Sequence, residues 1–167
     1  MAGHDGVGRP AFDRAVLATA AQALGVAQQL VDLAVRYACQ RQQFGVPIGS
    51  FQAVKHPLAS AQVRIEFARP VVYRAAWSVA RGARHRSLDV SHAKLAACEA
   101  ATAAARVALQ CFGAIGYTWE QDLHVWMRRA WSLDLAWGGA PFHRARVAEH
   151  VLADGARIGP GATFEGA

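Results

Sequence analysis

The stretch YACQRQQFGVPIGSFQAVKHPLA, residues 37–59, begins as a helix, breaks, and begins again. Gly45, Pro47 and Gly49 cluster at the break, and both residue types interrupt helices. Ser50 follows them and is a residue type that caps helix N-termini, so the pattern predicts that the next helix begins here. Gly45, Pro47 and Gly49 are sufficient to break the helix. The presence of Arg41 and Phe44 in the same stretch therefore indicates that it has a role besides chain reversal.

Outward from this break, apolar residues recur at three- and four-residue steps along most of the chain. In the upstream helix, the positions expected to face the core are Val16, Ala20, Leu24, Ala27, Val31, Ala34 and Ala38. The expected helices cover about residues 10–42, 50–82, 88–112, 121–137 and 141–153, with Pro70 kinking the second.

No segment carries a strand pattern, and the frequent alanines favour helices packed closely together. We therefore predict an all-α fold, an up-and-down four-helix bundle with an additional short C-terminal helix, over residues 11–153. A glycine-rich, flexible N-terminal arm is expected over residues 1–10 and a disordered tail over residues 154–167.

The composition limits the class of protein. The 167 residues suffice for one domain, and 53% of them are hydrophobic, enough for a core. No apolar stretch approaches the roughly 18 uninterrupted residues of a membrane span, and the N-terminus lacks a secretory pattern, so we expect a cytoplasmic protein. Cys39, Cys98 and Cys111 are widely spaced and no helical HxxxH pair occurs, which predicts neither disulfides nor a metal site.

The formal net charge of +6 permits an anionic partner. The basic residues are spread along the chain and form no dense tract, and no nucleic-acid-binding motif accompanies them. We therefore expect no nucleic-acid partner, whereas a cofactor that carries phosphate groups remains compatible with the charge.

The polar and aromatic residues at two turns are candidates for ligand contact. Arg41 carries a guanidinium that can clamp a pyrophosphate through two parallel hydrogen bonds. The ring of Phe44 can either stack on a flat heterocycle or plug the end of the bundle. Gln52 lies at the start of a helix, where anionic groups are favoured. The second turn contains Gln110, Gly113 and Gly116, where a ligand could approach the backbone, although a helix C-cap explains Gly113 equally well.

Two segments resemble a known family. RQQFGVPIGSFQAVKHPLA and, further on, LQCFGAIGYTWEQDLHVWMRRA are similar to the C-terminal helical domain of the flavin-dependent acyl-CoA dehydrogenases. The first looks like that family's arginine-x-x-phenylalanine-glycine motif, and the second like its glutamine-x-x-glycine-glycine-x-glycine segment. The resemblance runs from Phe12 to Leu152. The family's enzymes also contain an N-terminal helical domain and a middle β domain, which these residues do not resemble, so we do not expect activity from this chain alone.

The resemblance implies an FAD site at a subunit boundary. Arg41 would reach the FAD pyrophosphate of a neighbouring subunit, Phe44 would contact the cofactor, and Gln52 would lie near the adenosine. Gln110, Gly113 and Gly116 would lie along the adenine–pyrophosphate stretch, and Ala114 stands where the family usually has its second glycine.

The catalytic base is missing from the positions that the resemblance assigns to it. The family's chemistry removes a proton α to a thioester, for which a carboxylate must be within reach. Trp137 and Ala15 occupy the two places where family members carry this glutamate. Asp13 is close to one of them but points elsewhere by our interpretation, and Asp134 is a weak candidate for a displaced base.

Other residues near the missing base depart from the family as well. The segment GGAPFHR lacks the threonine and glutamine that many members direct at the adenosine, and His143 and Arg144 could substitute for them. Glu120 matches a glutamate in the family's turn, where a structural role is expected.

Two hypotheses from different classes remain. In the first, the domain contributes to an FAD site at a subunit interface and supports α,β-dehydrogenation of an acyl-CoA thioester in a homo- or hetero-oligomer with an acyl-CoA dehydrogenase-like subunit. In the second, it is a non-catalytic helical interaction or oligomerisation module derived from that family. The second hypothesis draws on four tryptophans in or beside one helix, namely Trp119, Trp126, Trp131 and Trp137.

Overall fold

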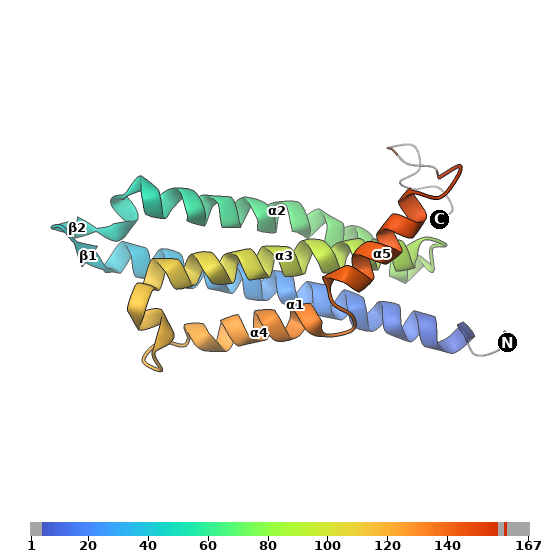
Figure 1. The fold of residues 1–167 in the computed structure, drawn as a ribbon, viewed down its shortest axis with the longest axis horizontal. Coiled ribbons are helices and arrows are strands. Elements are labelled where there is room, and N and C mark those ends of the chain that lie inside the picture. Colours follow the sequence, from blue (N-terminus) through green and yellow to red (C-terminus); the bar gives the residue numbers. More distant parts are fainter. Residues whose placement is uncertain (1–4, 157–158, 160–167) are drawn as a thin grey trace.

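The computed structural model describes residues 5–156 and residue 159, and it is helical almost throughout (Figure 1). Four helices run alongside one another and a fifth crosses α3 near one end of the bundle, which confirms the predicted all-α bundle with an additional C-terminal helix. The helices are α1 (Asp5–Gln40), α2 (Gln52–Arg81), α3 (Arg86–Phe112), α4 (Leu123–Leu135) and α5 (Ala140–Val151).

The ends of the chain differ in part from expectation. Helix α1 begins at Asp5, so residues 5–10 of the predicted arm are helical, and Pro10 is accommodated within the helix. Residues 1–4 lie outside the described part of the chain. The predicted tail, 154–167, falls mostly outside it as well, because only 154–156 and 159 are described there.

The core is built largely from alanine. All seven core positions predicted for α1 are buried, and α3 buries a long series of alanines with them, several at zero exposure. A methyl side chain lets two helix backbones approach closely, so the long helices α1 and α3 can pack along most of their length. Ile65 and Leu30 are the largest fully buried aliphatic residues of α2 and α1.

The break between α1 and α2 contains a small β-hairpin, so the prediction that no strand occurs was wrong at this point. Strands β1 (Gln42–Gln43) and β2 (Val46–Pro47) pair antiparallel, with Gln42 opposite Pro47. The two residues between them, Phe44 and Gly45, both have positive φ, 54° and 81°. Two successive positive-φ residues form the tight turn that closes a two-residue hairpin, which a search for alternating apolar residues does not detect.

The prediction that Ser50 caps α2 was also wrong. A 3-10 turn, η1 (Ile48–Ser50), follows the hairpin, and the N-cap of α2 is Phe51. The Ser50 hydroxyl instead donates a hydrogen bond to the Pro47 carbonyl at 2.7 Å, which stabilises the 3-10 turn. Helix α2 then continues through Pro57 and Pro70 and ends at Gly82, which is left-handed as expected for a helix C-terminus.

Two of the helical segments, Gly8–Gln40 and Arg86–Tyr117, are long and apolar enough by composition to cross a membrane. In this fold 50% and 44% of their most apolar windows are buried against other helices. Core helices of bundles have the same composition, so packing accounts for their apolar character.

Candidate functional site

The two motif-bearing turns lie at the same end of the bundle. The hairpin joins α1 to α2, and the 3-10 segment η2 (Gly113–Tyr117) joins α3 to α4 at that end (Figure 1). The rings of Tyr37 and Phe112 stack at 4.2 Å between centroids and hold the ends of α1 and α3 together. The thiol of Cys111 donates to the Ala34 carbonyl at 3.5 Å. The fold therefore gathers at one end the candidate cofactor-binding residues Arg41, Phe44, Gln52, Gln110, Gly113 and Gly116.

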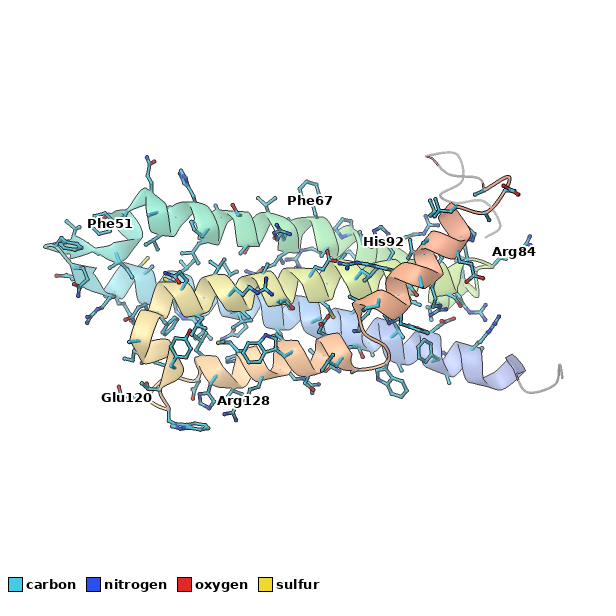
Figure 2. The ribbon with its side chains drawn as sticks, in the orientation of Figure 1. Phe51, Phe67, Arg84, His92, Glu120 and Arg128 are labelled. Atoms are coloured by element: carbon cyan, nitrogen blue, oxygen red, sulfur yellow. The ribbon has the colours of Figure 1, made fainter. Side chains whose placement is uncertain are left out.

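The hairpin presents an aromatic ring and a cation to the outside. Phe44 is 92% exposed, so it does not plug the bundle end, and its ring lies edge-on to Phe51 at 6.1 Å. Arg41 is exposed, and its backbone is fixed by hydrogen bonds from its N–H to Tyr37 and from the Ile48 N–H to its carbonyl, both 2.8 Å. No side-chain hydrogen bond or ion pair engages Arg41 within the described chain. Figure 2 shows Phe51 at this tip.

Glycine is favoured at positions 113 and 116 for different structural reasons. Gly113 has φ of 66° and open space around it, so its conformation favours glycine. Gly116 is buried, and a β carbon there would lie 3.0 Å from the side chains of Leu109 and Phe112. Gly116 therefore supports packing of the turn, whereas Gln52 and Gln110 are exposed on the helices beside it.

The η2–α4 turn adds an aromatic residue that the family motifs did not single out. Trp119 is exposed, with the guanidinium of Arg128 at 5.0 Å from its ring and the His124 ring at 4.5 Å. Glu120 is exposed at the same turn. The tryptophan-rich pattern of this segment was the sequence signal for Trp119.

One of the two expected base positions, Trp137, lies away from the hairpin and against the first part of α1, the helix that carries the other, Ala15. The ring of Phe12, one turn before Ala15 on α1, lies 6.3 Å from the ring of Trp137. Trp137 has φ of 57° and is 54% exposed. The first part of α1 and the turn that carries Trp137 are thus in contact, and neither Ala15 nor Trp137 is a carboxylate. Asp134 lies on α4, half-buried, one turn before Trp137.

The carboxylate of Asp13 is engaged in contacts within the chain. Its carboxylate is 1% exposed and accepts a hydrogen bond from the Ser87 hydroxyl at 2.7 Å. It also pairs with Arg86 at 3.5 Å and Arg146 at 3.6 Å. These contacts join the start of α1 to α3 and α5, so Asp13 is an internal ion-pair partner.

The turn that carries Trp137 is supported by two buried residues from other helices. Lys94 of α3 is 2% exposed, and its ammonium donates to the carbonyls of Asp134 at 2.9 Å and Gly138 at 3.3 Å. His143 of α5 lies 3.1 Å from the Trp137 carbonyl through Nε2 and 3.1 Å from the Ser91 hydroxyl through Nδ1.

The ionisation of His143 follows from these surroundings. Burial lowers the pKa of the imidazole, and the neighbouring Lys94 cation lowers it further. A neutral ring whose Nε2–H donates to the Trp137 carbonyl and whose Nδ1 accepts from Ser91 satisfies both contacts. His143 therefore does not face an adenosine, and Arg144 is exposed in an ion pair with Glu99.

Sequence reasoning missed Lys94. The available signal was a single lysine within the alanine-rich segment SHAKLAACEA, at helical spacing from apolar positions that are themselves buried. Gly138 is required in the same turn, because a β carbon there would lie 2.6 Å from the Phe142 ring.

Comparison with known proteins gives a consistent assignment. The profile of the family described as "Acyl-CoA dehydrogenase, C-terminal domain" matches residues 7–152. The chain is 42% identical over 118 residues to acyl-CoA dehydrogenase IpdE2 of Mycobacterium tuberculosis, covering 71% of this chain and 35% of the relative. It is 36% identical over 141 residues to the mitochondrial short-chain specific acyl-CoA dehydrogenase of Bos taurus, covering 84% of this chain and 34% of the relative.

Solved structures agree with this result. A glutaryl-coenzyme A dehydrogenase in complex with glutaryl-CoA superposes with a TM-score of 0.80 at 33% identity, over 90% of this chain and 39% of that one. A chain of the ChsE4–ChsE5 complex from Mycobacterium tuberculosis gives 0.79 at 30% identity, over 84% and 38%. The chain thus spans about a third of the length of the curated relatives that it matches. This chain belongs to the acyl-CoA dehydrogenase family and corresponds to its C-terminal helical domain.

Proposed function

We propose that this domain forms one wall of an FAD site at a subunit interface, with Arg41 and Phe44 directed at a cofactor that another subunit also contacts. The observation that supports the proposal is the strained and exposed conformation of Phe44 at the tip of the hairpin. A phenylalanine with positive φ is conformationally unfavourable by roughly 1–2 kcal/mol, and at 92% exposure its ring gains almost no burial in return. A contact made outside the described chain would supply the missing stabilisation.

The chemistry of the tip suits FAD. The guanidinium of Arg41 is exposed and can donate two parallel hydrogen bonds to a diphosphate. The ring of Phe44 can lie against a flat heterocycle, and the amides of Gln52 and Gln110 stand at the same end of the bundle. Bound FAD would supply the hydride acceptor, while these residues would hold and orient it.

The role in dehydrogenation is then a supporting one. Abstraction of the α proton from an acyl-CoA thioester needs a carboxylate, and the base positions hold Trp137 and Ala15. We propose that a companion acyl-CoA dehydrogenase-like subunit supplies this base and contacts the thioester. The ChsE4–ChsE5 complex, which this chain resembles, is an assembly of two differently named proteins.

The test is flavin retention in the assembled complex. The chain would be coexpressed with a candidate companion subunit, and the ratio of FAD to protein would be measured from the absorbance of the purified complex. We expect Arg41→Ala to lower this ratio several-fold. Arg64→Ala, which removes an exposed arginine from the side of α2, should leave it unchanged. Equal retention in the two variants would contradict the proposal.

The alternative, a non-catalytic oligomerisation module derived from the family, is favoured by the missing base carboxylates. It predicts that the assembled complex retains no flavin after FAD has been added and the unbound FAD removed, with or without Arg41. A complex whose yellow colour depends on Arg41 would exclude it.

A further inference from the structure

Trp137 has a backbone conformation that a bulky side chain rarely adopts. Its φ of 57° lies in the left-handed region, and Phe44 is the only other non-glycine residue of the described chain with positive φ. This conformation is unfavourable for a residue with a β carbon, and at 54% exposure the indole gains only part of the burial that would offset the cost. An aromatic residue in such a place indicates a role outside the core.

The backbone on both sides of Trp137 is fixed by side chains from α3 and α5. The ammonium of Lys94 donates to the carbonyls of Asp134 at 2.9 Å and Gly138 at 3.3 Å. Nε2 of His143 lies 3.1 Å from the carbonyl of Trp137 itself. Because Lys94 and His143 are buried, an outward movement of the turn would leave an ammonium and an imidazole without these partners in the interior. The fold therefore sets the position of the residue 137 side chain.

The indole is also confined on the side that faces α1. The ring of Phe12 lies edge-on to it, with 6.3 Å between centroids. Phe12 is in turn edge-on to Phe142 at 6.0 Å, and the guanidinium of Arg146 lies 5.6 Å from the centroids of both phenylalanine rings. A rotation of the indole toward α1 would displace this cluster, so the exposed part of the ring faces away from Phe12.

The size of the indole decides what can lie beside this turn. A general base must come within about 3 Å of the group whose proton it removes. Residue 137 is one of the two positions that the resemblance assigns to the base, so a reactive acyl-CoA thioester would place its α carbon where a glutamate carboxylate ends. An indole leaves the backbone along the same Cα–Cβ bond, is wider than a carboxylate and reaches further. It therefore occupies the space that the α carbon and the start of the acyl chain would need.

We infer that Trp137 is a specificity-determining residue that excludes acyl-CoA thioesters from the position beside the α4–α5 turn of this chain. The inference rests on the proposed function, because the complex with a companion subunit is the setting in which thioesters bind. The thioester then binds only where the companion supplies the base, and this chain supports that site without offering a second one.

Thioester binding by the coexpressed complex tests the inference. Equilibrium dialysis with butyryl-CoA, labelled in its coenzyme A part, counts the thioester sites for each pair of unlike chains. We expect Trp137→Gly to bind about twice as much butyryl-CoA per pair as the wild type, because the exclusion is removed. Glycine adopts positive φ without steric cost, so the helical circular dichroism spectrum should not change.

Two controls isolate the acyl group and the indole. Free coenzyme A lacks an acyl group, so the wild type and Trp137→Gly should bind it equally. Trp131→Ala removes another indole from the same segment, one that is 47% exposed on α4, and should leave butyryl-CoA binding at the wild-type level.

Equal binding of butyryl-CoA by the wild type and Trp137→Gly would overturn the inference. An equal gain in Trp131→Ala, or an equal gain in the binding of free coenzyme A, would overturn it as well. The ratio of FAD to protein, measured on the same samples, keeps the two proposals apart. Flavin retention that does not depend on Arg41, together with a gain of butyryl-CoA binding in Trp137→Gly, would contradict only the FAD proposal. Retention that depends on Arg41, without this gain, would contradict only the exclusion by Trp137.

Discussion

Gly113 and Gly116 stand three residues apart in one turn, and the sequence predicts that a ligand could approach the backbone at both. Gly113 is exposed and needs its positive φ, but Gly116 is enclosed by Leu109, Phe112 and Leu123. The same residue type therefore meets a conformational demand at one position and a packing demand at the other. Only the exposed one can lie against a cofactor.

Gly116→Ala is expected to destabilise the fold by about 1–3 kcal/mol, because its methyl group would sit 3.0 Å from two side chains of the core. Gly25→Ala is the matched change in the middle of α1, where nothing lies within 4 Å, and should stabilise by up to about 1 kcal/mol. Urea denaturation of both variants measures the difference. Equal midpoints would contradict the packing role of Gly116.

The lowered pKa of His143 predicts that the stability of the fold depends on pH. Its folded-state pKa is lowered, first by burial and then by Lys94, whereas in the unfolded chain it titrates near its ordinary value of about 6.5. The unfolded state therefore takes up the proton first, so this contribution is complete above that value and is lost as the pH falls below it. The urea midpoint of the wild type should fall more between about pH 7.5 and pH 5 than that of His143→Gln. Equal changes of the urea midpoint with pH in the wild type and in His143→Gln would show that His143 does not cause the pH dependence.

The hairpin between α1 and α2 is held by backbone hydrogen bonds and by its two positive-φ residues, and the Phe44 ring contributes little burial to it. Phe44→Gly should therefore leave the free energy of unfolding unchanged or raise it by up to about 1 kcal/mol, since glycine adopts positive φ without steric cost. Thermal unfolding measures this, and Phe51→Gly, at the N-cap of α2, is the control that should not stabilise. A marked loss of stability in Phe44→Gly would show that the ring has a structural role.

Helix α5 is attached to the bundle through Asp13, whose carboxylate pairs with arginines from α3 and α5. Asp13→Asn removes the charge and leaves Arg86 and Arg146 facing each other. We expect a loss of about 2–3 kcal/mol, below the 3–5 kcal/mol of a fully buried pair, because both guanidiniums keep some exposure to water. Hydrogen exchange should then accelerate in α5 more than in α2. Uniform acceleration in all helices would argue against a local attachment.

The bundle as a unit depends on the alanine-rich packing of α1 against α3. Ala101 is completely buried in α3, so Ala101→Leu would force the helices apart and should cost about 1–3 kcal/mol. Ala21→Leu, on the exposed side of α1, adds the same atoms to the surface and should change the stability by less than about 0.5 kcal/mol. Denaturant unfolding monitored by circular dichroism compares the two.

The two regions of interest lie apart in the bundle. The hairpin and the η2 turn are together at one end, whereas Trp137, one of the expected base positions, lies at the α4–α5 turn, against the first part of α1. Two buried residues, Lys94 and His143, fix that turn through three backbone carbonyls. The turn that carries Trp137 is thus fixed by side chains from two other helices.

The sequence by itself determined the helices, their order and the buried stripe of α1, because apolar spacing at 3.6 residues is a local property of the chain. It also marked Arg41, Phe44 and the absence of a carboxylate at positions 15 and 137. Only the tertiary structure decided which side chains face outward or inward at the turns. In the folded chain Phe44 is exposed and Gly116 is enclosed by side chains. His143 and Lys94 are buried and make hydrogen bonds to backbone carbonyls. Those outcomes depend on contacts between residues that are distant in sequence, and a local pattern carries no information about them.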